Sequence, residues 1–325
     1  MPDVITTDVE SAVDKIAHSH LCAIPTETVY GLGANAADAS AVARVFEAKD
    51  RPIDHPLIVH VADFQTAMLW LQDLPRWAQN LAQHFWPGPL TIVGHRTALA
   101  SDHITAGQNT VAVRVPNHSL VQQVLSQLQQ HGINGLVAPS ANKFGHVSPT
   151  TAQHVSDDLG DYLESHGDAI LDGGPSEVGI ESTLVLATGN IPVILRPGAI
   201  GVNDIEKITG LVPQANHSES IKISGNLASH YSPMAQVEII TSTDSIGDMK
   251  PAGLIALDDI ETPAHLVRLA APATSIEFAA DLYSAMRNAD ALGLSHIYVV
   301  IPEGDAMSDA LMDRVSRAAH SESGD

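Results

Sequence analysis

Lys49 and Arg51 stand two residues apart in the stretch EAKDRPIDHPLIVHV, and both belong to residue types that are scarce in this chain. Only 16 of the 325 residues are Lys or Arg, whereas 38 are Asp or Glu, which gives a formal net charge of -22. On such an acidic protein, a place where several cations converge is a local exception that suits an anionic ligand. The pair therefore predicts a site for an anion.

Two further motifs carry polar groups beside β-rich runs. The segment PTET, residues 25–28, follows such a run and would expose Thr26 and its neighbours in a loop, where α/β sheets place ligand groups. Taken alone, it is better explained by a solvated turn. His60 would share a strand face with Ile58, and a lone strand histidine is more often a hydrogen-bonded structural residue.

The segment TVAVRVP alternates strictly, so Thr110 and Arg114 fall on the same strand face. At ~3.3 Å per residue they are about 13 Å apart, enough for one strand to touch both ends of a nucleotide-sized ligand. An amphipathic edge strand with Arg114 in solvent explains the same spacing equally well.

The run VAPSANKFGHVSPT passes from a β-rich segment into a loop that carries Ser140 and Asn142. Ser148 has the character of a helix N-cap and Pro149 that of the first helical residue. A helix start with free backbone N–H groups beside such a loop predicts a phosphate site. The alternative is that Ser148 only caps its helix.

Later loops and strand ends bring a glycine pair, two further polar residues and one arginine: Gly173, Gly174, Glu181, Ser182 and Arg196. No P-loop motif occurs, so another architecture must hold any triphosphate. The segment GLGANA at 31–36 fits the dinucleotide form G-x-G-x-x-A only weakly, because PTETVY separates it from the preceding strand. A tight turn with positive φ explains both glycines as well.

Periodicity predicts the elements that must position these groups. We expect strands at 21–24, 57–61, 90–93, 110–115, 136–138, 169–172, 182–186 and 193–195, and a helix at 40–49. That helix must end near Asp50, because Pro52 disfavours the helical conformation for Arg51. Lys49 and Arg51 are therefore expected to be exposed cations at a helix end.

The alternation of strands and helices predicts an α/β domain over residues 1–211, followed by an interdomain linker at 212–235 and a smaller α/β domain at 236–325. Tyr231 lies in the linker and is not expected in either core. The single cysteine, Cys22, excludes an internal disulfide and is expected to be a small buried hydrophobe. The polar N-terminus and the absence of a long apolar run predict a cytoplasmic protein without a membrane span.

The motifs PTETVYGLGANA, AKDRPIDHPLIVHV, WPGPLT, TVAVRVP, APSAN, DGGPSEVGIEST and LRPGAI, taken in order, resemble the YrdC-like threonylcarbamoyl-AMP synthase family over roughly residues 8–205. LASHYSP and the later segments resemble the linker and C-terminal domain of its longer members. The resemblance implies an α/β fold in which a twisted mixed sheet and helices form an open cavity. It also implies a nucleotidyltransferase that condenses L-threonine, bicarbonate or CO2, and ATP into threonylcarbamoyl-AMP and diphosphate for tRNA modification.

The resemblance also implies roles for residues of this chain. Lys49 and Arg51 would serve the phosphate and carbamate region as catalytic groups. The nucleotide would be bound by Lys49, Thr110, Ser140, Asn142, Ser148, Arg196 and Tyr231, and L-threonine by Thr26, His60, Arg114 and Ser182. Mg²⁺ would be carried by ATP, without direct side-chain ligands.

The product would pass to a separate tRNA threonylcarbamoyl-transfer machinery, and the acidic composition argues against direct tRNA binding. The sequence departs from the family's pattern at two places. The linker has Gly225 to Ser229 where longer members carry a basic stretch, and the loop after Asn142 continues with Lys143 and Phe144, where the family often has small residues. A hydrogenase-maturation carbamoyltransferase would need cysteine-based zinc motifs that one cysteine cannot supply. The remaining alternative is a non-catalytic RNA-binding or ribosome-associated module of the same fold.

Overall fold

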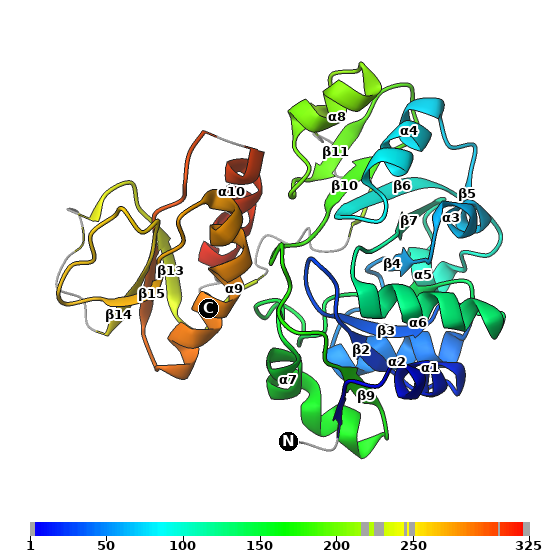
Figure 1. Ribbon diagram of the computed structural model, residues 1–325, viewed down its shortest axis with the longest axis horizontal. Helices are drawn as coiled ribbons and strands as arrows, with labels where there is room; N and C mark the ends of the chain where they lie inside the picture. Colours follow the sequence, from blue (N-terminus) through cyan, green and yellow to red (C-terminus); the bar gives the residue numbers. More distant parts are fainter. Residues whose placement is uncertain are drawn as a thin grey trace.

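The protein consists of two α/β units in the computed structural model, which describes residues 4–215, 221–223, 231–243, 246, 251–304 and 306–320. The N-terminal unit carries a 12-stranded sheet and the C-terminal unit a 4-stranded sheet. Figure 1 shows them side by side, with helices of the C-terminal unit between its own sheet and the N-terminal unit. Each unit therefore has a sheet of its own, as the alternating pattern predicts.

The larger sheet is mixed. Its strands are β1 (Ile5–Thr6), β2 (Cys22–Ile24), β3 (Gly31–Asn35), β4 (Ile58–His60), β5 (Leu71–Gln72), β6 (Leu90–Arg96), β7 (Thr110–Arg114), β8 (Leu136–Val137), β9 (Ala169–Leu171), β10 (Thr183–Leu186), β11 (Val193–Arg196) and β12 (Gln214–Ala215). They lie in the order β1-β9-β2-β3-β8-β4-β7-β6-β10-β11-β12, with β5 beside β6. Because β4 runs parallel to β7 whereas β6 runs antiparallel to it, the predicted mixed sheet is confirmed.

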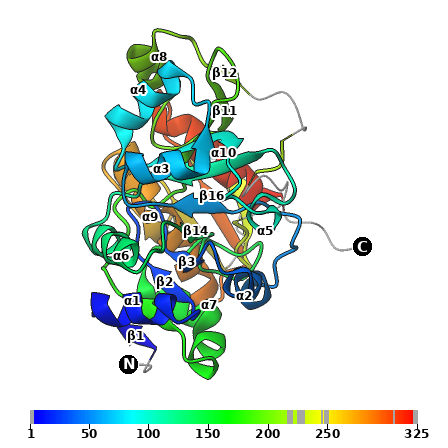
Figure 2. The same cartoon turned by 90° about the vertical axis from the view of Figure 1, so that its right-hand side faces the viewer.

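The helices of the N-terminal unit are α1 (Val9–Ala17), α2 (Ala39–Lys49), α3 (Phe64–Trp70), α4 (Arg76–Phe85), α5 (Asp102–Thr105), α6 (Ser119–Gln130), α7 (Ala152–Ser165) and α8 (Val202–Thr209). At the β9-β2-β3 end of the sheet, α1 and α6 cover one face and α2 and α7 the other. Cys22 and Ile24 pack with α1 and α6, while Ala23 between them packs with α2 and α7. Alternation along β2 thus buries both faces, and Figure 2 shows α1 and α6 together.

The strand that carries Arg114 lies inside the sheet. β7 pairs with β4 on one side and with β6 on the other, and Arg114 stands directly opposite His60. The edge-strand alternative, with Arg114 in solvent, is therefore wrong. The two polar residues share one register position because parallel pairing of β4 and β7 sets them side by side.

The GLGANA segment forms strand β3, so both the dinucleotide-turn and the tight-turn interpretations are wrong. β3 pairs antiparallel with β2 and with β8. A Cβ atom on Gly33 would lie 2.8 Å from the carbonyl oxygen of Cys22, and one on Gly31 would lie 3.0 Å from the Cβ of Ala138. Glycine is required here because the backbone of β2 and the residue after β8 approach closely, and not because the backbone has a positive φ.

Helix α2 matches its prediction in position but not in the exposure of its end. Asp38 caps its first turn, and Asp50 adopts the left-handed conformation directly after Lys49. Lys49 and Arg51 were expected to be exposed, yet only 1% and 6% of their surfaces are accessible. The loop that follows Ser140 covers them, because Phe144 lies over the guanidinium of Arg51 and hydrogen-bonds through its backbone N–H to the Lys49 carbonyl.

The helix expected at Ser148 and Pro149 begins later. α7 starts at Ala152, and the side chain of Thr151 caps it by accepting from the backbone N–H of His154. The Pro149 carbonyl accepts from the backbone N–H of Tyr30, so this stretch is tied to another loop rather than being helical. The Ser148 hydroxyl donates to Glu181 and is therefore not a helix cap.

The C-terminal unit is a small parallel α/β layer structure. Its strands β13 (Gln236–Ile239), β14 (Ala252–Ile255), β15 (Val267–Ala270) and β16 (His296–Val299) lie in the order β13-β16-β14-β15, and all pairs are parallel. Its helices are α9 (Ser275–Ala291) and α10 (Ala306–Ala319). Both helices face the N-terminal unit (Figure 1).

One hydrophobic cluster joins the two units. Val29, Val147 and Ile180 of the N-terminal unit pack with buried residues of α9 and α10. Tyr231 belongs to the same cluster and is 1% exposed, so the expectation that it lies outside any core is wrong. Cys22 is buried, as expected.

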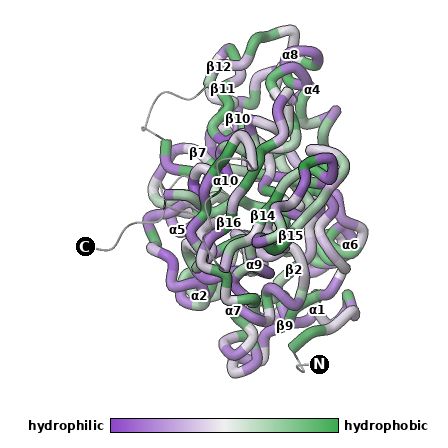
Figure 3. The backbone as a smooth tube through the Cα atoms, turned by 90° about the vertical axis from the view of Figure 1, so that its left-hand side faces the viewer, coloured by the Kyte–Doolittle hydropathy of each residue, from purple (hydrophilic) through white to green (hydrophobic). Residues whose placement is uncertain are grey.

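No helix among the described residues is long and apolar enough to cross a membrane. The hydropathy of the backbone in Figure 3 changes repeatedly between hydrophilic and hydrophobic along the helices. Such alternation is typical of helices that bury part of their surface and expose the rest.

Candidate active site

A polar cavity of about 520 Å³ lies where the ends of β4, β7, β10 and β11 meet the loops that follow β2 and β8. Its lining residues are Thr26, Thr28, Val29, Gly31, Arg51, Ile58, His60, Arg114, Ala138, Pro139, Ser140, Glu181, Ser182, Arg196 and Tyr231. Eight of the predicted site residues are among them: Thr26, Arg51, His60, Arg114, Ser140, Ser182, Arg196 and Tyr231. The fold thus brings together residues that are separated by more than 200 positions in the sequence.

Arg114 and His60 form one side of this cavity. The Arg114 guanidinium donates to the Thr28 hydroxyl at 2.8 Å, and another of its nitrogens lies 2.7 Å from a carboxylate oxygen of Glu27. The Nδ1 atom of His60 lies 3.3 Å from the carbonyl oxygen of Ile58. Burial, together with the charge of Arg114, lowers the pKa of His60 to about 3. The imidazole is therefore neutral near pH 7 and acts as a hydrogen-bonding group.

The hydroxyls of Thr26 and Ser182 are held by their neighbours. The Thr26 hydroxyl donates to the carbonyl of Val29 at 2.6 Å and lies 2.9 Å from the Thr28 hydroxyl. The Ser182 hydroxyl lies 2.7 Å from that of Thr91. The PTET segment was expected to be exposed if it is a solvated turn, but Thr26, Glu27 and Thr28 are all buried.

Arg51 and Arg196 line the cavity from two other segments. The Arg196 guanidinium donates to the Ser182 carbonyl at 3.0 and 3.2 Å and to the Ser182 hydroxyl at 3.3 Å. Arg51 donates to the carbonyl of Pro56 at 3.1 Å. Burial lowers the pKa of Arg51 to about 10 and also lowers the pKa of Arg196. An anion in this cavity would relieve that cost.

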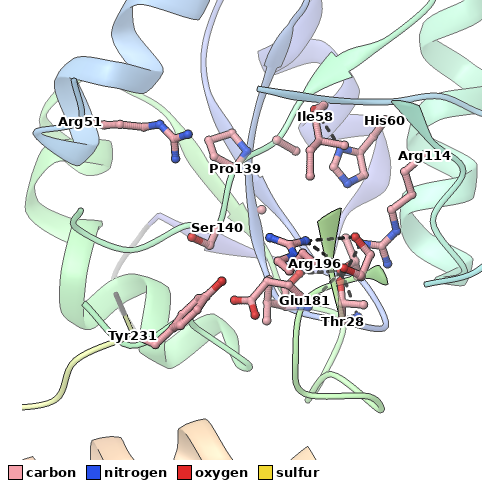
Figure 4. A pocket seen from close by; sticks show the side chains of 15 residues that line it. Thr28, Arg51, Ile58, His60, Arg114, Pro139, Ser140, Glu181, Arg196 and Tyr231 are labelled. Atoms are coloured by element: carbon pink, nitrogen blue, oxygen red, sulfur yellow. Dashed lines mark hydrogen bonds between the residues drawn. The ribbon is translucent and has the colours of Figure 1, made fainter. Parts of the chain in front are cut away.

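Figure 4 shows how these groups are distributed. Arg51 lies on one side of the cavity with Ser140, His60 and Arg114 lie on the opposite side, and Arg196 stands between them. The aromatic ring of Tyr231 approaches from the side of Ser140. The cavity therefore offers cations at two separate places, as a ligand with two anionic ends would need.

Lys49 and Asn142 support the cavity from behind and are not among its lining residues. The Lys49 ammonium donates to the backbone carbonyls of Ser140 and Asn142. The Asn142 side-chain amide donates to the carbonyls of Lys143 and His146 at 2.7 and 2.9 Å. Together these contacts fix the loop that presents Ser140. Burial, and secondarily the charge of Arg51, lowers the pKa of Lys49 well below its usual range.

Thr110 and Ser148 also lie outside the cavity lining. Thr110 stands at the other end of β7 and lines an adjoining depression of about 290 Å³, which shares Ile58 with the main cavity. Lys222 and Ile223 line the same depression, so the described residues 221–223 lie over this part of the sheet. Ser148 donates to a carboxylate oxygen of Glu181 at 2.7 Å.

Seven lining residues had no assigned role in the sequence-based prediction, and two of them, Thr28 and Glu181, have hydrogen-bonding side chains. Thr28 belongs to the PTET motif and Glu181 directly precedes Ser182, so both were visible as polar residues next to predicted ones. The contacts that give them a place in the cavity come from segments more than 30 residues away. Sequence spacing gives no signal for such contacts.

The comparisons with known proteins agree over both units. The Sua5, YciO and YrdC family model, described as telomere recombination, matches residues 14–198, and the model of the threonylcarbamoyl-AMP synthase C-terminal domain matches residues 200–320. Threonylcarbamoyl-AMP synthase of Pyrococcus abyssi is 37% identical, over 94% of this chain and 92% of its own length. The chain belongs to the threonylcarbamoyl-AMP synthase family.

Other members of this family support the same placement. Threonylcarbamoyl-AMP synthase of Bacillus subtilis is 33% identical, over 96% of this chain and 92% of its own length. The crystal structure of P. abyssi Sua5 complexed with L-threonine superposes with a TM-score of 0.85 at 35% identity, covering 96% of this chain and 94% of that chain. The two-domain form of the synthase family is therefore shown for this chain.

The structure describes only the second residue of the linker pair His230-Tyr231. His230 lies outside the described residues, as does the departure at residues 225–229. Tyr231 lines the cavity, and its ring stacks on that of Tyr283 with ring centroids 5.6 Å apart. The second departure, Lys143 and Phe144, borders the site, since Phe144 lies over Arg51 and Lys143 pairs with Asp50 at 2.6 Å.

Proposed function

We propose that the protein is an L-threonylcarbamoyladenylate synthase, a nucleotidyltransferase that converts L-threonine, bicarbonate or CO2, and ATP into threonylcarbamoyl-AMP and diphosphate. The observation that carries this proposal is the convergence of Arg51, Arg114 and Arg196 on one cavity of a chain with a net charge of -22. Membership of the synthase family and the similarity to a threonine-complexed structure support it.

The reaction asks for alignment rather than for a protein nucleophile. The threonine amine and CO2 form a carbamate, a carbamate oxygen attacks the α-phosphorus of ATP, and diphosphate leaves. Both reactants are anions, so they must be held in line while their charges are neutralised. In this proposal Arg51 and Arg196 neutralise the nucleotide side of the cavity and Arg114 the threonine carboxylate.

The threonine site would use hydrogen-bonding groups beside Arg114. His60, which stays neutral near pH 7, and the hydroxyls of Thr26 and Ser182 surround the same side of the cavity. Arg114 is already oriented by Thr28 and Glu27, so the guanidinium is preorganised for a carboxylate. This arrangement favours an amino acid with a free carboxylate and a small polar side chain.

The nucleotide would lie along the opposite side, towards Tyr231. Ser140 belongs to a loop that Lys49 and Asn142 hold in place, so we propose that these two residues act on the nucleotide through that loop. Thr110 lines the adjoining depression, where a nucleotide extending past Ile58 would reach it. Ser148 acts through Glu181.

Mg²⁺ would enter with the phosphates of ATP. Glu181 is an acidic side chain of the cavity lining, but its carboxylate already accepts from Ser148, Tyr283 and Arg314. Oxygen ligands from the triphosphate suit Mg²⁺, which usually keeps few protein ligands at such sites. When bound, the ion would neutralise charge on the phosphates. The product would then pass to a separate tRNA threonylcarbamoyl-transfer machinery, without direct tRNA binding by this acidic protein.

The test is product formation by the purified protein. Incubation with ATP, Mg²⁺, L-threonine and ¹³C-bicarbonate should give labelled threonylcarbamoyl-AMP by mass spectrometry, and diphosphate release should require all three substrates. Omission of one substrate at a time provides the controls. ATP cleavage at an equal rate without threonine, with no labelled adenylate, would contradict the proposal.

A further inference from the structure

Arg314 is a fully buried arginine on α10 of the C-terminal unit, and it contacts the N-terminal unit directly behind the cavity. Its Nε donates to a carboxylate oxygen of Glu181 at 2.7 Å. One of its terminal nitrogens donates to the carbonyl of Pro197 at 2.9 Å. The planar guanidinium can hold both groups at once because its donors form a rigid fork.

Both acceptors are chain neighbours of predicted substrate-binding residues. Glu181 precedes Ser182, and Pro197 follows Arg196. Arg196 in turn donates to the Ser182 carbonyl and hydroxyl, so the two loops are joined on the cavity side as well. One side chain of α10 therefore holds both loops from behind.

A second residue of the C-terminal unit, Tyr283, also binds the Glu181 carboxylate. The Tyr283 hydroxyl donates to the Glu181 oxygen that Arg314 binds, at 2.9 Å. The ring of Tyr231 stacks on Tyr283, and the Arg314 guanidinium lies 5.6 Å from the Tyr231 ring centroid. Glu181, two residues of the C-terminal unit and one cavity-lining aromatic thus form one buried cluster.

We propose that Arg314 is a positioning residue, through which the C-terminal unit sets the geometry of Ser182 and Arg196 in the substrate cavity. The proposal rests on the function proposed above, because it assigns those two residues to substrate binding. It gives the C-terminal unit a part in the reaction that does not depend on contact with a substrate. A missing guanidinium would leave the Glu181 carboxylate and the Pro197 carbonyl without this partner, and both loops would shift.

The kinetic test compares Arg314→Met with Asp158→Asn. Asp158 joins the two units through Arg287, at 2.8 Å, without touching either loop, so it is a matched control for interface strength. We expect Arg314→Met to raise the KM for L-threonine and for ATP by about tenfold or more, while Asp158→Asn changes both by less than about twofold. Arg314→Lys should fall between them, because an ammonium cannot span both acceptors.

A double-mutant cycle separates positioning from general loss of stability. Arg314→Met with Glu181→Gln should raise both KM values by less than the product of the two single effects, because each single substitution already removes the Arg314–Glu181 contact. Wild-type KM values in folded Arg314→Met would overturn the proposal, and so would fully additive effects in the cycle.

A readout without substrates separates this inference from the proposed function. Hydrogen exchange of the backbone amides at 181–200 should quicken in ligand-free Arg314→Met, or in Arg314→Lys if the first variant does not fold, but not in Asp158→Asn. Unchanged exchange would overturn the positioning role. A wild-type protein that forms no threonylcarbamoyl-AMP would refute the proposed function alone.

Discussion

Arg51 and Arg196 of the cavity and Arg314 of the interface between the units are buried, Arg287 of the interface is partly buried, and the surroundings of the two pairs differ. Arg51 and Arg196 donate to backbone carbonyls, and burial lowers the pKa of both. Arg314 and Arg287 instead meet the carboxylates of Glu181 and Asp158. Burial alone would raise the pKa of Glu181, yet the charges of Arg314 and Arg196 lower it to about 2.

This difference concerns Arg51 and Arg196 and not the third cavity arginine, Arg114, which pairs with Glu27 at 2.7 Å. The interface arginines gain favourable interactions with carboxylates within the protein, so their charge is used for structure. The charges of Arg51 and Arg196 are disfavoured by burial in the ligand-free protein, a cost that is typical of functional sites. Binding of a phosphate or carboxylate would offset this cost. Substitution of Arg51 or Arg196 should therefore lower activity with little loss of stability, whereas substitution of an interface arginine should lower stability as well.

The largest effect is expected for Arg51→Met. Loss of a preorganised charge at the reacting phosphate should lower kcat/KM for ATP by two to three orders of magnitude, about 3–4 kcal/mol. The free energy of unfolding should change by less than about 1 kcal/mol, because the buried charge contributes little to folding. Steady-state kinetics and urea denaturation measure the two quantities.

The matched control is Arg44→Met, outside the cavity. Arg44 pairs with Asp168, whose side chain is fully buried, so this substitution should lower stability by roughly 1–3 kcal/mol while activity stays near wild type. Equal losses of stability and activity in the Arg51 variant would contradict the distinction.

Lys49→Met should lower the free energy of unfolding by more than is expected for an exposed lysine, the position that the sequence predicted. The ammonium binds two carbonyls of the Ser140 loop, and loss of these contacts should cost roughly 1–3 kcal/mol. Because the same loop carries Ser140, the KM for ATP should rise in parallel. A variant that is inactive yet as stable as wild type would instead favour direct contact between Lys49 and the phosphates.

His60→Ala should raise the KM for L-threonine by about tenfold, near 1.4 kcal/mol, with a smaller effect on the KM for ATP. The pKa of about 3 means that the imidazole does not ionise between pH 5 and 8. The pH profile of kcat/KM should therefore keep its shape in the variant. Disappearance of an ionisation near pH 6.5 would show that His60 titrates during the reaction.

The last prediction concerns the carboxylate of the interface, Glu181. The pKa of Glu181 is lowered from 4.5 to about 2, so its contribution to stability is complete above about pH 4.5 and is lost as the pH falls towards 2. The stability difference between wild type and Glu181→Gln should narrow in that window, by at most about 1.4 kcal/mol per pH unit. Chemical denaturation at pH 5.0, 4.0 and 3.0 measures it, and a constant difference would contradict the assignment.

Local patterns predicted eight strands of the larger sheet and helix α2. Runs of β-favouring residues located β2, β4 and β6 to β11, but not the short strands β1, β5 and β12, and Pro52 fixed the end of α2. The glycine-rich strand β3 was missed because Gly31 and Gly33 carry no apolar side chains that could alternate. The Ser-Pro pair at 148–149 predicted a helix start that Thr151 provides instead, since both kinds of residue suit such a position.

Arg314 shows how a visible signal can be overlooked. It falls at helical spacing with Met307, Leu311 and Ala318, which are buried positions of α10. Periodicity alone would therefore have placed a charged side chain on the apolar stripe of this helix. An arginine on a helix is usually taken to face solvent, and its partners Glu181 and Pro197, both more than 100 residues away, together with the adjacent Asp313, explain the exception.

The sequence by itself determined the family, the order of the polar motifs and the segments that carry the candidate site. Each of these depends on residues close together in the chain. Only the tertiary structure decided that Lys49 backs a loop instead of lining the cavity, that Arg114 stands on an inner strand, and that Arg314 reaches the substrate loops. Such properties depend on burial and on partners brought together by sheet order and packing, which act between residues too distant in sequence for spacing to encode.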